Sequence, residues 1–408
     1  MNCRHCDFPL EQTFLDLGFS PPSNAYLTES DLTKPEKYYP LKIKVCTNCW
    51  LVQTEDYVPA DELFNLDYAY FSSASIGWLK HTANFSEKII QLLNLGKDSL
   101  VIEVASNDGY LLKNFLNRKI PCLGIEPTDS TASVAENLGI PVMREFFGEK
   151  LGIKLASMEK KADLIVGNNV YAHVPDINDF TRGLKSVLKP NGTITLEFPH
   201  LMQLIGKVQF DTVYHEHFSY LSLISVTNIF NEAGIRVYDC EELSTHGGSL
   251  RIFGCHSDDP RPTSSNVYNM INKEISFGLM NISLYNGFQE KADKIKDDFK
   301  TFLEYQKKLG KLIIGYGAAA KGNTLLNYAG IKGDIINFVC DIAPSKQGKY
   351  LPGSHIPILN PFKIEEYHPD WVIIFPWNIA DEVIQQQQSI KKWGGKFVTA
   401  IPELRVLE

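Results

Sequence analysis

Two pairs of cysteines with identical spacing, Cys3-Arg-His-Cys6 and Cys46-Thr-Asn-Cys49, most strongly constrain how the first part of this 408-residue chain can fold. A two-residue gap lets both thiolates of a tight turn point at one ion. Two such turns complete a tetrahedral site of four sulfurs, which is the closed geometry of structural zinc. Disulfides are the alternative, but the N-terminus lacks the apolar core of a secretion signal and the intervening sequence is not rich in cysteine. We therefore predict a structural zinc site with no part in the chemistry.

The histidines nearest to this site are not needed as ligands, because four cysteines complete the site without them. We expect His5, inside the first pair, to face solvent, and His81 to lie elsewhere. The remaining cysteines lie among apolar neighbours and are expected to be buried free thiols: Cys122, Cys240, Cys255 and Cys340.

Length and charge exclude several classes of protein. A chain of 408 residues is expected to form two or three domains, each with its own core. The formal net charge of −8 argues against a binder of nucleic acid or of membrane surfaces, which would be basic. No apolar run approaches the roughly 18 residues that a membrane span needs. We expect a soluble, cytoplasmic monomer.

The middle of the chain alternates between short apolar runs and helix-length stretches. The runs predict strands at Leu100–Val104, Cys122–Ile125, Leu164–Val166 and Thr193–Phe198, the last launched by a turn at residues 189–192. Such alternation is typical of βαβ units in a mainly parallel sheet. Two further runs, Ile235–Glu241 and Ser249–Cys255, predict a closing antiparallel pair joined by residues 243–248.

A second βαβ rhythm follows a polar linker at residues 256–264 and amphipathic helices up to about Leu309. We predict an α/β protein with a zinc-binding domain at residues 1–68 and two Rossmann-like domains. In the first, at 69–258, a strand that contains Glu103 is followed by a turn of small residues, which is the opening typical of a class I methyltransferase, so we expect a domain of that type. The second Rossmann-like domain is expected at 259–408. The strands expected in this last part are Leu312–Tyr316, Ile336–Cys340, Trp371–Phe375 and Lys396–Thr399.

A turn of small residues follows the first central strand, which contains Glu103. The turn, Ala105-Ser106-Asn107-Asp108-Gly109, lets the backbone approach a cofactor closely. The next strand ends at Glu126, whose carboxylate can accept both hydroxyls of a ribose. Because that placement suits S-adenosyl-methionine and NAD equally, these residues alone leave the cofactor open. The fourth strand ends at Asn168, at the sheet edge where ligands bind.

The densest chemistry lies at Tyr214-His215-Glu216-His217, with His173 and His200 before it in the sequence. Imidazoles beside a carboxylate and a phenol can exchange protons near neutral pH. The alternatives without a catalytic role are a capped helix start or surface histidines. A second zinc site is another, although histidines two residues apart are no common ligand pair. We favour acid–base catalysis.

Near the C-terminus, Gly315-Tyr-Gly317-Ala318-Ala-Ala-Lys321-Gly-Asn323 follows a predicted strand and opens a helix. Its backbone N–H groups and the Lys321 ammonium favour an anion such as a diphosphate. It is not a P-loop, and a vestigial turn inside a domain core is the alternative. Asp341, after the next strand, is a candidate for the sugar or base of a nucleotide, and Tyr316 or Trp377 for stacking on the base.

In combination and order these segments resemble the sugar C-methyltransferases, which methylate C-3 or C-5 of nucleotide-linked deoxysugars. The resemblance covers essentially the whole chain. It includes the four cysteines, the two glycine turns and the Tyr214–His217 cluster, and also Tyr68-Ala-Tyr-Phe-Ser-Ser and Phe146-Phe147-Gly148. It implies S-adenosyl-methionine in the middle domain and a nucleotide sugar with a 4-keto group, most often dTDP-linked, against the C-terminal domain.

The resemblance also implies residue roles. His217 is the expected base, Tyr214 and Glu216 shape its position and protonation, and His173 and Tyr68 are candidates to bond the ketone or sugar hydroxyls. The cofactor residues it implies, with Asn168 added from its place at the strand end, are Glu103, Asn107, Gly109, Glu126, Phe147 and Asn168. The residues expected to bind the nucleotide sugar are Gly317, Ala318, Lys321, Asn323 and Asp341.

Two rival functions remain at the level of the sequence. One is an NAD-dependent oxidoreductase with two Rossmann sheets, although neither turn has an intact Gly-x-Gly-x-x-Gly. The other is a zinc-ribbon protein that binds nucleic acid without catalysis, which the acidic composition disfavours. Methylation at C-3 and at C-5 needs the same chemistry, so the residues named above are compatible with either position.

Overall fold

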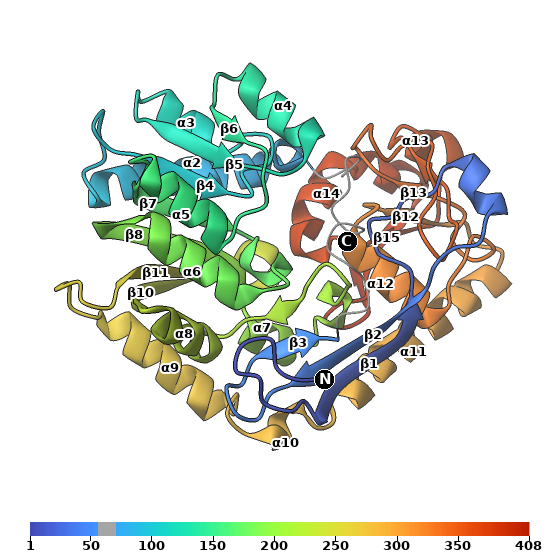
Figure 1. Cartoon of the computed structure of the whole chain (residues 1–408). Helices are drawn as coiled ribbons and strands as arrows, with labels where there is room; N and C mark the ends of the chain where they lie inside the picture. The colour runs from blue at the N-terminus through green and yellow to red at the C-terminus, as the bar shows by residue number, and fades with distance from the viewer. Residues whose placement is uncertain (56–70, 408) are drawn as a thin grey trace.

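The computed structural model describes residues 1–55 and 71–407, which form three β-sheets with helices around them (Figure 1). Tyr68, expected to bond the substrate, lies outside the described residues. The expected α/β class, with a cysteine-bearing N-terminal part and two Rossmann-like sheets, is confirmed. Within the described ranges, no helix is both long enough and apolar enough to cross a membrane.

The N-terminal sheet is antiparallel and has the order β1-β2-β3-β9. Pro21 and Pro22 end its first strand, since proline cannot donate to a strand ladder. The fourth strand comes from much later in the chain, so this sheet is completed by the central part of the molecule. Its strands are β1 (Gln12–Ser20), β2 (Tyr39–Val45), β3 (Val52–Thr54) and β9 (Ser219–Tyr220).

The central sheet has seven strands in the order β10-β11-β8-β7-β4-β5-β6. The five strands from β6 to β8 run parallel, and β11 and β10 close that edge as the expected antiparallel pair. Their bounds are β4 (Val101–Val104), β5 (Cys122–Ile125), β6 (Val142–Met143), β7 (Ala162–Asn168), β8 (Leu188–Pro199), β10 (Ile235–Leu243) and β11 (Ser249–His256).

Helices cover both faces of the central sheet, as the apolar runs predicted. Successive residues of β7 alternate between two cores: Leu164 and Val166 pack in a core with residues of α2 and α3, and Ile165 packs in one with residues of α5, α6 and α8. The helices are α2 (Ile76–Leu92), α3 (Leu112–Leu116), α4 (Asp129–Asn137), α5 (Glu149–Ser157), α6 (Ile177–Val187), α7 (Leu201–Gly206) and α8 (Leu223–Ala233).

The C-terminal sheet has the order β14-β13-β12-β15-β16-β17, with only β17 antiparallel. Three helices carry the chain to it from the central sheet, namely α9 (Ser265–Phe277), α10 (Ile282–Tyr285) and α11 (Phe288–Lys308). Its own elements are β12 (Ile313–Tyr316), α12 (Ala320–Ala329), β13 (Val339–Cys340), β14 (Ile358–Leu359), α13 (Lys363–Tyr367), β15 (Trp371–Ile374), α14 (Ala380–Gln386), β16 (Lys396–Thr399) and β17 (Arg405–Leu407).

The N-terminal part joins the two larger lobes because it shares a core with each. Phe14 of β1 packs on Phe288 of α11, with ring centroids 4.6 Å apart. In the other direction, Cys46 and Leu51 belong to the same buried core as Ile102 of the central sheet. In Figure 1 the N-terminal strands lie along α11, below the space between the two lobes. This placement brings residues before position 55 close to both lobes.

Two local expectations are corrected. Residues 189–192, expected as a turn before the fourth central strand, lie inside β8. They are extra residues in an irregular register, because Ala162 of β7 pairs with Leu188 and Leu164 already pairs with Thr193. His5, expected to face solvent, is buried: its Nδ1 lies 2.8 Å from Asn178 Oδ1 of α6, so it docks the first cysteine turn on the central lobe. The four cysteines outside the cluster are buried and free, as expected.

Candidate active site

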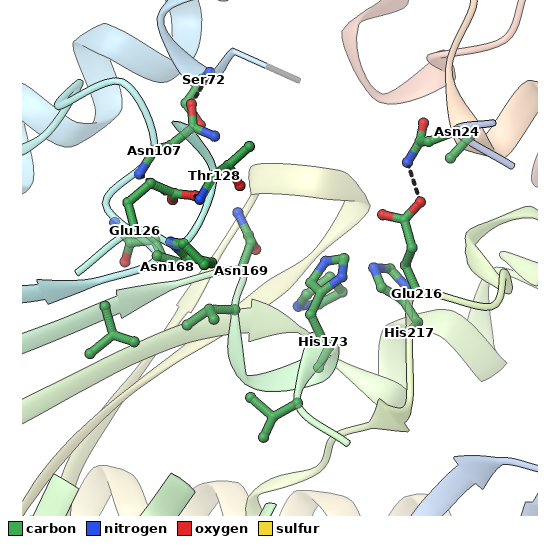
Figure 2. A pocket seen from close by; sticks show the side chains of 18 of the residues that line it. Asn24, Ser72, Asn107, Glu126, Thr128, Asn168, Asn169, His173, Glu216 and His217 are labelled. Atoms are coloured by element: carbon green, nitrogen blue, oxygen red, sulfur yellow. Dashed lines mark hydrogen bonds between the residues drawn. The ribbon is translucent and has the colours of Figure 1, made fainter. Parts of the chain in front are cut away.

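One cavity of about 750 Å³ connects the cofactor turn, the histidine cluster and the C-terminal lobe. The carboxyl ends of β4, β5 and β7 form one end of it, where parallel α/β sheets bind ligands. Its lining includes nine of the residues selected from the sequence: Asn107, Glu126, Phe147, Asn168, His173, Tyr214, Glu216, His217 and Lys321. Figure 2 shows the cofactor turn on one side of this space and His173, Glu216 and His217 on the other.

His217 is held in one tautomer by the carbonyl of Thr212. That oxygen can only accept, and it lies 2.8 Å from His217 Nδ1, so Nδ1 carries the hydrogen. Nε2 then has a lone pair and accepts from the Tyr214 hydroxyl, 2.7 Å away. Burial, with a further contribution from nearby His173, lowers the pKa of His217 well below its ordinary value. The imidazole is therefore neutral at physiological pH, as a proton acceptor must be.

His173 and Glu216 flank this imidazole. The His173 ring lies edge-on to the His217 ring with centroids 4.6 Å apart, and burial lowers the pKa of His173 to about 4. Glu216 is 2 % exposed, and its Oε1 accepts from Asn24 Nδ2 at 2.6 Å (Figure 2). Asn24 belongs to the N-terminal part and was not selected from the sequence.

The cofactor turn is held in a left-handed backbone conformation at two residues that are not glycine. Ala105 and Asn107 have φ values of 56° and 48°, which aims the turn at the cavity. Glu126 holds this shape, since its carboxylate accepts from the backbone N–H of Asn107 and of Thr128, both at 2.9 Å.

Two of the expected cofactor residues lie behind the turn. Gly109 has φ 79°, and a side chain there would meet Ile140 at 2.5 Å, so its role in the structure is packing against the next helix. Glu103 is fully buried, and burial raises its pKa well above the ordinary value. Neither residue contributes to the cavity lining, whereas Asn107, Glu126, Phe147 and Asn168 do.

A charged network supports the same end of the central sheet. Glu197 lies near the end of β8 and pairs with Arg251 of β11. His81 Nε2 lies 2.9 Å from the carboxylate, and the Thr245 hydroxyl donates to it at 2.8 Å. Burial alone would raise the pKa of Glu197, but the His81 hydrogen bond and the Arg251 charge outweigh burial and hold it at about 2. This carboxylate is ionised and fully paired.

His246 is a cavity residue that the sequence reasoning missed. It follows Thr245, accepts from Asn169 Nδ2 at 3.3 Å, and lies edge-on to Trp78 at 5.2 Å. Burial lowers its pKa to about 4. Three consecutive positive φ values, 54°, 88° and 126°, turn the backbone sharply from His246 to Gly248. The Gly247-Gly248 pair was the available sequence signal for that turn.

Lys321 faces the main cavity from the start of α12. Its Nζ lies 2.9 Å from Asn378 Oδ1 and 4.5 Å from the centre of the Trp377 ring, and burial lowers its pKa. Below it, the Trp377 indole donates to Asp211 at 2.7 Å. Burial raises the pKa of Asp211 to about 6, although Lys321 opposes this effect. Trp377, a candidate for base stacking, is therefore engaged in this contact and lines neither cavity.

A second cavity of about 780 Å³ adjoins the first on the C-terminal lobe, and Trp78, His246 and Lys346 line both. Gly317, Tyr316 and Asp341 line it, but Asp341 is occupied by the backbone N–H groups of Ala318 and Ala343, both at 2.8 Å.

Two expected substrate residues do not reach either cavity. Ala318 is fully buried and its carbonyl accepts from Tyr26 and Lys346. Asn323 is also fully buried, and its amide donates to the Ser23 carbonyl at 2.6 Å. Their side chains serve the packing of the N-terminal segment on this lobe.

Comparison with known proteins gives a consistent assignment along the chain. Three family models match: a zinc binding domain at residues 3–64, a methyltransferase domain at 69–239 and a C-methyltransferase C-terminal domain at 244–402. The C-methyltransferase NovU of Streptomyces niveus is 31 % identical over 405 residues, which cover 99 % of this chain and 96 % of NovU.

This chain belongs to the C-methyltransferase family. Among solved structures, the methyltransferase is also similar to an S-adenosylmethionine-dependent methyltransferase from Clostridium acetobutylicum, with 11 % identity, 44 % of this chain and 92 % of that chain covered, and a TM-score of 0.36. Magnesium protoporphyrin IX methyltransferase from Synechocystis has 14 % identity, covers 45 % of this chain and 81 % of its own, and has a TM-score of 0.35.

S-adenosyl-L-methionine is the cofactor of this methyltransferase, and the residues of the turn fit it. Glu126 supplies a carboxylate at the end of β5 for ribose hydroxyls, and Phe147, which packs edge-on to Phe180 at 5.2 Å, supplies an aromatic surface for adenine. The Asn169 Oδ1 atom is buried without a hydrogen-bond partner among the described residues, so the lining offers an unused acceptor. When bound, the cofactor supplies an electrophilic methyl group.

The four cysteines of the methyltransferase fit a zinc ion, as predicted. Their sulfurs lie within 4.8 Å of one another, and the Cys3–Cys49 and Cys6–Cys46 sulfurs are 3.5 and 3.6 Å apart. Zinc–sulfur bonds of about 2.3 Å in a tetrahedron require sulfurs about 3.8 Å apart. The Gln53 amide donates to Cys3 Sγ at 3.1 Å, which stabilises a thiolate.

Proposed function

We propose that the substrate of this methyltransferase is a deoxyhexose with a 4-keto group, linked to a nucleotide, dTDP. The enzyme methylates the carbon beside the ketone, at C-3′. The observation that carries this proposal is the shared cavity, which joins the cofactor turn, a neutral imidazole whose Nε2 carries a lone pair and a lysine of the second lobe. Carbon is acidic enough for an imidazole only when a neighbouring carbonyl can hold the charge as an enolate.

In this reaction His217 Nε2 would take the proton from the carbon beside the ketone. The enolate carbon would then form its new bond to the methyl group that the cofactor supplies, with the methyl–sulfur bond breaking and its electron pair staying on sulfur. Thr212 fixes the tautomer of the imidazole, and the Tyr214 hydroxyl, which donates to Nε2 in this structure, has to turn away from that lone pair when the substrate carbon takes its place. His173, whose pKa of about 4 keeps it a neutral imidazole, lines the cavity beside His217 and is assigned to a sugar hydroxyl next to the ketone. Lys321, which lines the same cavity, adds a positive charge that stabilises the anionic enolate.

The nucleotide half of the substrate is assigned to the second cavity. Lys346 lines both cavities and lies near the first turn of α12, so it favours a diphosphate that passes between them. Tyr316 offers an aromatic surface for the base deeper in this cavity. The apolar side chains of Ile342, Ile379 and Val383 line it as well, which suits an uncharged base.

The test uses 4-keto sugars linked to dTDP, CDP and GDP, with product analysis by NMR and substrate exchange in D2O. The wild-type enzyme should place the new methyl on carbon and exchange the adjacent hydrogen for deuterium. His217→Asn should lower both rates by about 10²–10⁴-fold, as loss of a general base does, with cofactor affinity unchanged. A product methylated on oxygen or nitrogen would contradict the proposal, as would exchange that is unchanged in His217→Asn.

A further inference from the structure

The segment of residues 21–27, which follows β1, crosses from the N-terminal sheet to the C-terminal lobe. Asn323 Nδ2 donates to the Ser23 carbonyl at 2.6 Å, and the Tyr26 hydroxyl donates to the Ala318 carbonyl at 2.6 Å. The backbones of Leu27 and Tyr350 exchange two hydrogen bonds of 3.0 and 2.8 Å. Because these contacts lie on both sides of Asn24, the backbone at that residue is fixed relative to the C-terminal lobe.

The side chain of Asn24 points the other way, to the central lobe. Its Nδ2 donates to Glu216 Oε1 at 2.6 Å, a charge-assisted bond inside the main cavity, as Figure 2 shows. Glu216 immediately precedes His217 in a stretch between Val213 and β9 that belongs to no helix or strand. Besides a turn bond from the His217 N–H to the Tyr214 carbonyl, side-chain contacts fix where this stretch lies, and Glu216 is nearly inaccessible to solvent that could replace the amide.

We propose that Asn24 is a positioning residue of the active site: it holds the Glu216 carboxylate, and with it the Tyr214–His217 turn, in the geometry that presents His217 to the substrate. This inference rests on the proposed function, because proton abstraction by His217 is what the positioning serves. It makes the N-terminal part, which carries the zinc site, contribute a side chain to the active site.

The test compares Asn24→Ala and Asn24→Asp with wild type in kcat, KM, cofactor affinity and melting temperature. Loss of a hydrogen bond to a buried charged group should lower kcat of Asn24→Ala about 10- to 100-fold. KM and cofactor Kd should change less than about threefold, since binding is not the step that the contact serves. Asn24→Asp should be slower still, because a second carboxylate then faces Glu216. Thr28→Ala, an exposed neighbour outside both cavities, is the matched control and should keep its kcat.

A kcat of Asn24→Ala within twofold of wild type overturns the proposal, as does a loss that appears only in KM. If Asn24→Ala does not fold, Asn24→Ser, which keeps a donor, is measured in its place and should retain more activity than Asn24→Asp. If wild type methylates no 4-keto sugar, the proposed function fails separately. The contact is then tested without substrate, by the melting temperatures of Asn24→Ala, Glu216→Ala and the double variant: non-additive shifts support it and additive shifts refute it.

Discussion

The buried ion pair between Glu197 and Arg251 gives the sharpest prediction of stability. The two residues lie opposite each other on β8 and β11, and their side chains are 0 % and 3 % exposed. Among the described residues, Arg251 is the only arginine or lysine in contact with this carboxylate, and Arg251→Met removes it while His81 and Thr245 remain. We expect a large loss of stability, because the variant leaves a buried carboxylate without its compensating charge.

The magnitude follows from two independent routes. The pKa of Glu197 lies at about 2 against an ordinary 4.5. A difference of about 2.5, at about 1.4 kcal/mol per pH unit, gives about 3.5 kcal/mol from all its partners together. Breaking a buried pair by removing one partner costs about 3–5 kcal/mol. Since each kcal/mol shifts the melting temperature of a domain of this size by about 2–4 °C, Arg251→Met should melt about 6–20 °C below wild type.

Thermal unfolding followed by circular dichroism at pH 7 measures this shift. Lys88→Met is the control, since Lys88 forms an exposed ion pair with Glu241 at 2.7 Å and should cost no more than about 1 kcal/mol. The double variant Arg251→Met/Glu197→Gln should recover part of the loss, because no carboxylate is then left uncompensated. If Arg251→Met melts within 2 °C of wild type, the reasoning about this pair is wrong.

Three further predictions concern zinc, cofactor and pH. Cys46→Ser should contain no zinc by metal analysis and should melt at a lower temperature than wild type. Cys240→Ser, at a buried thiol outside the cluster, should keep its zinc. A metal-free Cys46→Ser of normal stability would refute the structural role. Glu126→Ala should bind the cofactor about 10- to 100-fold more weakly than wild type by calorimetry. Glu136→Ala, at an exposed residue, is the control and should change the affinity little. Equal cofactor affinities of Glu126→Ala and wild type would contradict the assignment. Because the folded pKa of Glu197 is depressed, its contribution is complete above about pH 4.5 and is lost as pH falls towards 2. The difference in melting temperature between wild type and Glu197→Gln should therefore be constant above about pH 5 and shrink below it. A constant difference down to pH 3 would show that the partners do not lower the pKa of this carboxylate.

Spacing in the sequence predicted the features that depend on neighbours along the chain. The two cysteine pairs predicted the sulfur cluster, because a tight turn fixes where both thiols of a pair lie. Strands such as Cys122–Ile125 and Lys396–Thr399 have the predicted bounds, since a short apolar run between helices can be buried only in a sheet. Acidic Glu126 was found at a strand end for the same reason, and the structure places it in the cavity lining.

Selection by motif was less informative where a side chain could point to either side of the backbone. Gly109 and Glu103 belong to the cofactor turn by sequence, yet in the structure both are packed behind the turn and do not face the cavity. Asn323 follows the C-terminal turn but bonds to Ser23, some 300 residues earlier. Their spacing could not predict these partners, because each contact joins elements that meet only in the folded chain.

The sequence by itself determined which parts of this methyltransferase form sheets and where four cysteines can hold a metal, because these properties depend on periodicity and on residues a few positions apart. Only the tertiary structure decided that Asn24 meets Glu216, that His246 enters the cavity and that Lys321 and His217 line the same space. These contacts arise from packing three sheets around one space, and the packing depends on shared cores that no local pattern specifies.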